Sequence, residues 1–443
     1  MSESRRRVLC LAYHFPPLAG GGIVRIQAFV KYLPSYGYLP WVLTVDPRWY
    51  AERQRDEAPL REYMEGVQIV RTRSLMPVSR ATQAIYDSAL GHNRRPLPFS
   101  KLLKPVLKII FNVVAVPDEM ILWTPFALWS GLTIIQTWKP DLILATTPPH
   151  SVGLIGAALS RLTRTPLVLD VRDDWVGNAF HSHHSRPRLW LDRLLERFAV
   201  GSASRIIAVT EASRQFLQLK YPEREPDVFR LTPNGFDPQA FAALDTIDSA
   251  LPPRRARVRL VYTGGMTRKR SPASFFAALR LLLDTCPTLA DELEVILAGS
   301  IHWEFRELSQ ELGLKDIVIY GGHLTKQAAL KLLSTADLGL VIIAAEEGGQ
   351  TAIPGKVYEY LAAGVHVLAL TDPSSALSTL MREIGFGTQV PQHDIQAIAS
   401  ILRALLESAQ RTPLRQSLPP PILNRFSRLE HTRQLAACFD ELL

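Results

Sequence analysis

The chain is poor in cysteine and lacks any long apolar run. Only three cysteines occur in 443 residues, and Cys10, Cys286 and Cys438 form no C-x-x-C pair, so we expect reduced structural thiols. No uninterrupted apolar stretch approaches the roughly 18 to 20 residues of a membrane span. The basic start, MSESRRR, is not followed by a signal-peptide apolar region. These absences predict a soluble, cytoplasmic protein.

Three kinds of binding site are missing as well. No G-x-G-x-x-G fingerprint with a following acidic residue occurs, which argues against a dinucleotide cofactor. His181, His183 and His184 lie close together, but no carboxylate or cysteine stands at ligand spacing, so we expect a solvated loop and no metal site. No helical pattern carries a dense basic stripe, and a nucleic-acid partner is therefore not expected.

Positive charge is concentrated in the first half of the chain. Residues 1–240 hold 30 Lys and Arg against 21 Asp and Glu, a balance of +9, whereas the remainder holds 20 against 21. Such a bias attracts anionic lipid or an acidic acceptor. The lysines Lys101, Lys104 and Lys108, together with Trp123 and Trp129, are a candidate surface for peripheral contact with an anionic membrane. A helix packed on a sheet with snorkelling lysines explains the same pattern.

Short apolar runs alternate with helical patterns throughout. In the first half the expected strands are Val8–Tyr13, Trp41–Val45, Val67–Arg71, Asp141–Thr146, Leu167–Val171, Arg205–Thr210 and Val228–Leu231. In the second half they are Leu260–Thr263, Glu294–Ala298, Ile317–Tyr320, Leu338–Ala344 and Val365–Leu370. This alternation predicts an α/β protein with doubly wound parallel sheets covered by helices on both faces.

The length favours two domains of about 200 residues each. Residues 238–257 lose the periodicity and contain Pro252-Pro253, so they are the expected linker. The predicted domains are residues 1–240 and 257–418. A proline-rich patch at 419–421 opens the last segment, residues 419–443, which ends in a closing helix.

The stretch from Asp337 to Leu370 carries the clearest functional pattern. After the apolar run Leu338–Ala344, a loop leads to Pro354 at the start of an expected helix, Gly355–Ala363. The backbone N–H groups that enter such a helix, from Thr351, Ala352 and Ile353 onward, are donors for an anion. Lys356 supplies a counter-charge for phosphate, and Glu359 accepts hydrogen bonds from a neutral diol. Diphosphate and sugar hydroxyls together indicate a nucleotide-sugar site.

Two glycine loops follow expected strands. Gly20, Gly21 and Gly22 let the backbone approach a ligand closely, although a plain tight turn explains them too. Gly264 and Gly265 precede the cations Arg268, Lys269 and Arg270, at the end of a strand where open α/β sheets bind ligands. Of these cations we favour Arg270 for the donor phosphate, and a solvated basic loop is the alternative.

Polar residues also follow strands of the first half. His150 stands where a neutral imidazole can orient a hydroxyl or accept its proton, although a capping or core histidine fits equally. In LDVRDDW, a pair between Arg172 and a carboxylate is expected to shape the cleft, and Asp173 is a candidate for acceptor contact. Asn234 lies in a turn that leaves the first domain, near the expected cleft.

Seven short motifs occur in a recognisable order. They are HFPPLAGGG, PDEMILW, TTPPHS, DVRDDW, TPNGFD, YTGG and PGKVYEYLAAG. This order resembles the retaining GT-B-fold glycosyltransferases of family 4 over nearly the whole chain, and it is most similar to the branch used in cell-surface polysaccharide and glycolipid assembly. The resemblance implies two Rossmann-like domains facing across a cleft. It implies an acceptor held by the first domain, a sugar nucleotide held by the second, and a closing helix that returns to the first.

The resemblance also implies roles for individual residues. Glu359 matches the family's glutamate on the ribose hydroxyls, and Arg270 falls at its phosphate-binding lysine. Gly20 to Gly22 match the glycine loop near the donor phosphate, and His150 is the nearest candidate for its first-domain histidine. Two positions depart from the family, because Thr351 stands in place of a glutamate and Gly265 in place of an arginine.

The expected function is retaining transfer of a sugar from a UDP- or GDP-sugar to an acceptor hydroxyl on a glycan or lipid-linked acceptor. Arg270, Lys356 and backbone amides are the groups expected to stabilise the leaving diphosphate. The resemblance implies that no metal is needed, and no other cofactor is expected. His150 and Asp173 serve the acceptor. A GT-B-fold sugar-nucleotide epimerase and a non-catalytic nucleotide-sugar-binding subunit are the alternatives.

Overall fold

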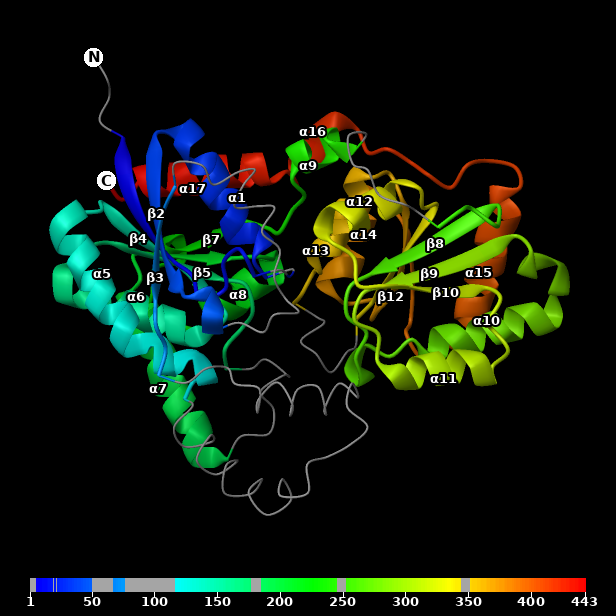
Figure 1. The fold of residues 1–443 in the computed structure, drawn as a ribbon, viewed down its shortest axis with the longest axis horizontal. Helices are drawn as coiled ribbons and strands as arrows, with labels where there is room; N and C mark the ends of the chain where they lie inside the picture. Colours follow the sequence, from blue (N-terminus) through cyan, green and yellow to red (C-terminus); the bar gives the residue numbers. More distant parts are fainter. Residues whose placement is uncertain are drawn as a thin grey trace. The chain divides into compact units, whose positions relative to one another are not determined.

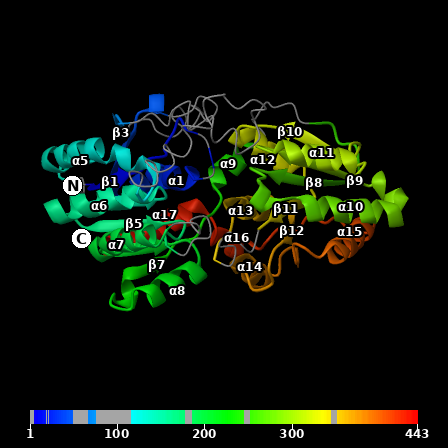
Figure 2. The same ribbon diagram turned by 90° about the horizontal axis from the view of Figure 1, so that it is seen from below.

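The computed structural model describes residues 5–18, 20, 22–49, 67–75, 116–176, 185–244, 252–343 and 351–443 (Figures 1 and 2). The described chain divides into two compact units. The first unit holds the residues up to Pro233 together with Arg428–Leu443, and the second holds Asn234–Ser427. The second unit is therefore inserted between two parts of the first.

The first unit is built on a seven-stranded parallel sheet of order β3-β2-β1-β4-β5-β6-β7. Its strands are β1 (Arg6–Leu11), β2 (Tyr38–Val45), β3 (Gln68–Thr72), β4 (Leu142–Thr147), β5 (Leu167–Val171), β6 (Arg205–Ala208) and β7 (Phe229–Leu231). Its helices are α1 (Val24–Tyr32), α5 (Thr124–Trp138), α6 (His150–Thr163), α7 (Arg186–Ser202), α8 (Glu211–Lys220) and α17 (Arg428–Asp440).

The second unit repeats the plan with a six-stranded parallel sheet of order β10-β9-β8-β11-β12-β13. Its strands are β8 (Val258–Thr263), β9 (Leu293–Ala298), β10 (Val318–Gly322), β11 (Leu338–Ile342), β12 (His366–Leu370) and β13 (Thr388–Val390). Its helices are α9 (Pro238–Ala242), α10 (Ala273–Thr285), α11 (Trp303–Glu311), α12 (Lys326–Ser334), α13 (Gly355–Ala362), α14 (Ala376–Ile384), α15 (Ile395–Ala409) and α16 (Pro420–Asn424). The predicted pair of parallel Rossmann-like sheets is confirmed.

Helices cover both faces of each sheet, so the central strands are apolar on both sides. In β1, Leu9 and Leu11 face one apolar cluster while Val8 and Cys10 face another. In β8, Leu260 belongs to one cluster of the second unit and Val261 to the other. Alternate side chains of a strand point to opposite faces, and continuous apolar runs are therefore what a parallel sheet covered on both faces requires.

The last helix, α17, completes the core of the first unit. Leu435 and Phe439 are fully buried among Val8, Cys10 and Phe29. Figures 1 and 2 show α17, in red, lying beside α1, in blue, although the two helices are far apart in the sequence.

The prediction that residues 238–257 form a linker is wrong for residues 238–242. Residues Pro238–Ala242 form α9, and Phe241 packs edge-on against Phe236 at 5.8 Å in the second unit. The second unit therefore begins at Asn234, before residue 240. The proline patch at 419–421 begins α16 instead of only breaking the chain, because proline is tolerated in the first turn of a helix.

Trp123 does not lie on a membrane-facing surface. It is fully buried, and its Nε1–H donates to Thr72 Oγ1 at 2.7 Å, whereas Trp129 is 77% exposed. Lys101, Lys104 and Lys108 lie outside the described residues. No helix in the described part of the chain is both long and apolar enough to cross a membrane.

A buried ion pair lies under the loops of the first unit. The Arg25 guanidinium in α1 donates to Asp170 at 2.8 and 3.0 Å, and Thr146 Oγ1 donates to the same carboxylate at 2.8 Å. Arg25 is 5% exposed and Asp170 is fully buried. The pairing of Arg172 with a carboxylate is therefore wrong, because Arg25, which lies in a different segment, satisfies Asp170.

Asp170→Asn should reduce the free energy of unfolding by about 3–5 kcal/mol, because Arg25 would keep a buried charge without its partner. Thermal and urea unfolding of the full chain measure this. The matched control is Glu223→Gln, which removes an exposed carboxylate from its pair with Arg197 and should leave stability unchanged. Equal effects of the two substitutions would contradict the assignment.

Candidate functional site

In each sheet the strand order reverses at one point, where the chain turns from adding strands on one side to adding them on the other. In the second unit this point lies between β8 and β11, which are neighbours in the sheet but not in sequence. Open α/β sheets bind ligands outside the carboxyl ends of the strands at such a point. Gly264 and Gly265 follow β8, and the segment after β11 leads through Thr351, Ala352 and Ile353 into α13.

The loop after β8 requires glycine because two backbones approach closely. Gly264 has a φ of +125°, and its N–H donates to Ala298 O at 2.8 Å. A Cβ on Gly299, whose φ is +127°, would lie only 2.1 Å from the Gly264 carbonyl oxygen. Both residues therefore need glycine for backbone reasons. The importance of Gly299 was missed from the sequence, where it appears as a lone glycine after a strand.

Lys356 folds back over this loop. Its Nζ lies 3.5 Å from the centre of the Tyr262 ring, and a Cβ on Gly264 would be 3.2 Å from the same nitrogen. The Tyr262 hydroxyl donates to Gly265 O at 2.6 Å, which fixes the ring. A side chain at Gly264 would crowd the ammonium group, so the glycine and the lysine form one arrangement.

The positive charge on Lys356 is poorly compensated. Burial and, to a smaller extent, the charges of Arg270 and Lys326 lower its pKa to about 7, although the charge of Glu359 opposes them. A lysine destabilised in this way gains from any anion that binds beside it. The arrangement therefore favours a phosphate group at the head of α13, where no side chain caps the helix.

Glu359 lies one turn further along α13 and is 8% exposed. Its carboxylate forms an ion pair with Nζ of Lys326, the first residue of α12. Lys326 was not expected from the sequence, although it follows the carboxyl end of β10, which closes on Gly321 and Gly322. The pair leaves a buried carboxylate at the site, next to a lysine that is 43% exposed.

The three cations after Gly265 differ in their surroundings. Arg268 pairs with Glu304, both through Nε at 3.0 Å and through Nη2, so its charge is already used. Arg270 is exposed, and its backbone N–H donates to the Thr267 side chain at 3.4 Å. Because Arg270 also acts on the pKa of Lys356, these two cations belong to one site.

In the first unit the corresponding point lies between β1 and β4. Arg172, directly after β5, donates to Thr147 O at 3.0 Å and also to the carbonyls of Gly22 and Pro148. A Cβ on Gly22 would lie 2.9 Å from the Arg172 guanidinium. Arg172 thus joins the loops after β1, β4 and β5, and Gly22 makes room for it.

Two histidines stand at this edge of the first sheet. His150 begins α6, is 4% exposed, and stacks on Trp175 at 4.8 Å. His14, in the HFPP motif, was not singled out from the sequence. Burial and the charge of Arg172 lower the pKa of His14 to about 4, so its ring is neutral at pH 7. Its Nδ1 is buried without a hydrogen-bond partner among the described residues.

The remaining predicted residues are placed as follows. Asp173 is exposed, and Asn234 is partly exposed as the first residue of the second unit. Gly20 is exposed with a φ of +143°. Gly21, His181, His183 and His184 lie outside the described residues. In the described part of the chain, no three His, Cys, Asp or Glu side chains gather as metal ligands.

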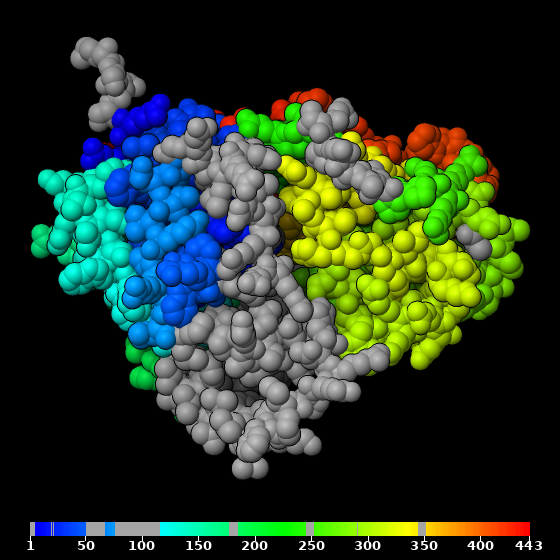
Figure 3. Space-filling model, viewed as in Figure 1, coloured from blue at the N-terminus to red at the C-terminus, as the bar shows by residue number. Residues whose placement is uncertain are grey.

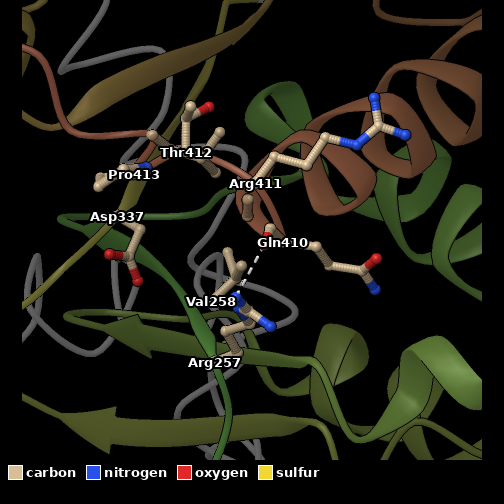
Figure 4. Close-up of a pocket in the computed structure, with 9 residues that line it drawn as sticks. Arg257, Val258, Asp337, Gln410, Arg411, Thr412 and Pro413 are labelled. Atoms are coloured by element: carbon tan, nitrogen blue, oxygen red, sulfur yellow. Dashed lines mark hydrogen bonds between the residues drawn. The ribbon is translucent and has the colours of Figure 1, made fainter.

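A separate pocket lies at the opposite edge of the second sheet (Figure 4). It is lined by Val258 at the start of β8, by Asp337 before β11, and by residues 409–414, from the end of α15 onward. Arg257 donates across it to Gln410 O at 3.1 Å. None of the predicted site residues lines this pocket, which distinguishes it from the site at the carboxyl ends.

Known families match both units. Residues 20–235 match the family described as Glycosyl transferase 4-like domain, and residues 257–408 match the family described as Glycosyl transferases group 1. Together the two matches span most of the chain. No curated protein sequence is recognisably similar to it.

Solved structures share the fold at low sequence identity. Sucrose-phosphate synthase from Thermosynechococcus elongatus has a TM-score of 0.64 at 15% identity, with 99% of each chain covered. A putative UDP-N-acetylglucosamine 2-epimerase from Listeria monocytogenes has a TM-score of 0.54 at 11% identity, covering 97% of this chain and 94% of that one. WaaG, a glycosyltransferase involved in lipopolysaccharide biosynthesis, has a TM-score of 0.54 at 14% identity, covering 97% and 95%.

The solved structures include both transferases and an epimerase, so their likeness establishes the fold alone. The matched families are more specific. Both are glycosyltransferase families, and the chain is therefore a GT-B glycosyltransferase with a family-4-like first domain and a group 1 second domain.

Proposed function

We propose that this glycosyltransferase is a retaining enzyme that uses a UDP- or GDP-sugar. It transfers the sugar to a hydroxyl of a glycan or lipid-linked acceptor, in assembly of a cell-surface polysaccharide or glycolipid. The observation that carries the donor part is the poorly compensated Lys356 at the head of α13, with the buried carboxylate of Glu359 one turn further on. The retaining mechanism and the biosynthetic branch rest on the resemblance to family 4.

The site can neutralise a diphosphate with protein groups alone. Lys356, Arg270 and the uncapped N-terminus of α13 supply positive charge at one edge of the sheet. Negative charge builds on the diphosphate as the sugar leaves, so cations fixed there stabilise the transition state more than the ground state. We therefore propose that the reaction needs no metal ion.

Glu359 is suited to the ribose of the donor. A buried carboxylate accepts hydrogen bonds from two neighbouring hydroxyls, and Lys326 holds it in place before the donor arrives. Thr351 stands where the family has a glutamate, so in this chain the backbone amides of Thr351, Ala352 and Ile353 contribute contacts to the donor without a second carboxylate.

The first unit is proposed to hold the acceptor. Arg172 donates its hydrogen bonds to backbone carbonyls, so we propose that it shapes the loops. Asp173 and Asn234 remain the proposed contacts to the acceptor. A histidine that orients a hydroxyl must be accessible and neutral. His14 is half-buried with a neutral ring and fits this better than His150, which is 4% exposed and stacks on Trp175.

Glu359→Ala should weaken binding of the cognate sugar nucleotide by about 1–3 kcal/mol, because the ribose hydroxyls would lose their acceptor. Calorimetric titration with UDP-glucose and GDP-mannose, after a thermal-shift panel of sugar nucleotides, measures this. The control is Glu383→Ala, an exposed carboxylate of the same unit that pairs with Arg425. Unchanged affinity in the Glu359 variant would remove this residue from the site.

Donor affinity should fall as the pH rises above 7. In the free protein Lys356 is mostly protonated below about pH 7 and mostly neutral above it. A bound diphosphate favours the ammonium form, so binding above pH 7 takes up a proton and the affinity drops by up to about tenfold per pH unit. Titrations in buffers of different ionisation enthalpy detect the proton. Lys356→Met should abolish the pH dependence; its persistence would exclude Lys356 as the source.

Arg270→Ala should lower kcat more than donor affinity, because its proposed contact strengthens as the diphosphate leaves. The matched control is Arg268→Ala. Arg268 lies in the same short helical turn as Arg270, but its charge is already paired with Glu304. Equal kcat values for wild type and the Arg270 variant would refute the leaving-group role.

The two alternatives give separate results in the same experiments. An epimerase would convert UDP-N-acetylglucosamine to its epimer without an acceptor, and we expect no epimer. A non-catalytic subunit would bind the donors of the panel weakly or not at all and would transfer no sugar. We expect at least one donor to raise the melting temperature and its sugar to be transferred to an acceptor.

A further inference from the structure

Helix α7 of the first unit exposes an apolar stripe to solvent. Trp190 is 66% exposed, Leu194 is 51% exposed and Phe198 is 41% exposed, although large apolar side chains of a helix normally face the core. The three residues are spaced four apart and therefore follow one side of the helix. Three large apolar side chains exposed in one row on a surface helix are typical of an interaction site.

Arginines border the stripe. Arg186, Arg193 and Arg197 are exposed on the same side of α7. At 100° per residue the three arginines and the three apolar residues fall within an arc of roughly 140°. We name this surface, formed by Arg186, Trp190, Arg193, Leu194, Arg197 and Phe198, the α7 face.

The acidic residues of α7 are turned away from the α7 face. Asp192 is 5% exposed and pairs with Arg188 at 2.9 Å, and Glu196 is 4% exposed and pairs with Lys220 at 2.7 Å. Both carboxylates are therefore neutralised inside the unit. Among the described residues, the exposed carboxylate that pairs with an arginine of the α7 face is Glu223, which lies 2.7 Å from Arg197. Arg186 and Arg193 make no ion pair within the part of the chain that the structure describes.

We propose that the α7 face binds the surface of an anionic lipid bilayer. A helix with aromatic and aliphatic residues on one stripe, arginines beside it and no acidic residue of its own exposed has the chemistry of an interfacial helix. Tryptophan is favoured at the boundary of headgroups and acyl chains, and each arginine near the surface is attracted by anionic lipid. A protein partner would need acidic side chains placed opposite these arginines. An anionic bilayer offers negative charge in its headgroups without such matched placement.

The surroundings of α7 agree with this occupant. Helix α6 contacts α5 and α7, and the three helices lie on one side of the sheet (Figures 1 and 2). Trp129 on α5 and Leu162 on α6 are 77% and 67% exposed, and α5 itself carries no charged residue. Figure 3 shows residues of the cyan part of the chain, which includes α5, at the surface of the first unit. The inference deepens the proposed function, because a lipid-linked acceptor would be reached from such a surface.

Vesicle cosedimentation of the full chain tests the proposal. We expect binding to vesicles of equal parts phosphatidylglycerol and phosphatidylcholine, little binding to pure phosphatidylcholine, and weaker binding at high salt. Trp190→Ser combined with Leu194→Ser should lower partitioning by about tenfold or more, and Arg193→Gln by about fivefold. The control is Leu219→Ser, a leucine of α8 in the same unit that is 82% exposed and should not affect binding.

Three results would overturn the proposal. The first is that the wild-type chain does not bind anionic vesicles. The second is that the Trp190/Leu194 variant binds them as well as the wild type does. The third is that the wild-type chain sediments as a dimer without binding vesicles, and that the Trp190/Leu194 substitutions abolish this dimer. Donor titration of the same variant keeps the two proposals apart. Unchanged donor affinity together with lost vesicle binding supports the α7 face, whereas a chain that binds vesicles but no donor refutes the proposed function alone.

Discussion

Parallel pairing of the strands is the constraint on which both units depend. Because all strands of a sheet run in one direction, every loop that leaves a carboxyl end emerges at the same edge. The strand order then decides which loops become neighbours. In the second unit β8 lies beside β11, and this contact brings Gly264 under the side chain of Lys356, although the two residues are far apart in sequence. Hydrogen bonding of the sheet thus builds the site before any ligand contributes.

The same edge holds a cation in each unit, but the two cations differ in how they are satisfied. Arg172 donates to backbone carbonyls of three loops, and its charge holds them together. Burial lowers the pKa of both cations, but Lys356 has an aromatic ring and two further cations around it, and its pKa falls to about 7. A cation whose hydrogen bonds are made within the protein stabilises the fold, whereas a cation surrounded by other positive charges is stabilised when an anion binds. This contrast separates a structural arginine from a proposed binding lysine.

The strands and helices of the sheets could be predicted from the sequence because apolar runs and glycine or proline boundaries are local signals. Leu167–Val171 agrees with the structure, and Gly355–Ala363 differs from α13 by one residue. Pairings between distant segments could not be predicted. Arg25 and Asp170 are separated by 145 positions, and nothing in LDVRDDW indicates that its buried aspartate is neutralised from α1. The direction of a side chain is equally hidden, as the buried Trp123 shows.

The insertion of one unit within the other has a consequence for biosynthesis. Leu435 and Phe439 fill the core beside β1, so the apolar core on that face of the first unit stays incomplete until α17 has left the ribosome. By then the whole of the inserted unit is already available to fold. A nascent chain that stalls before α17 would carry one finished body and one body with an open apolar face, which is the state that chaperones and proteases recognise.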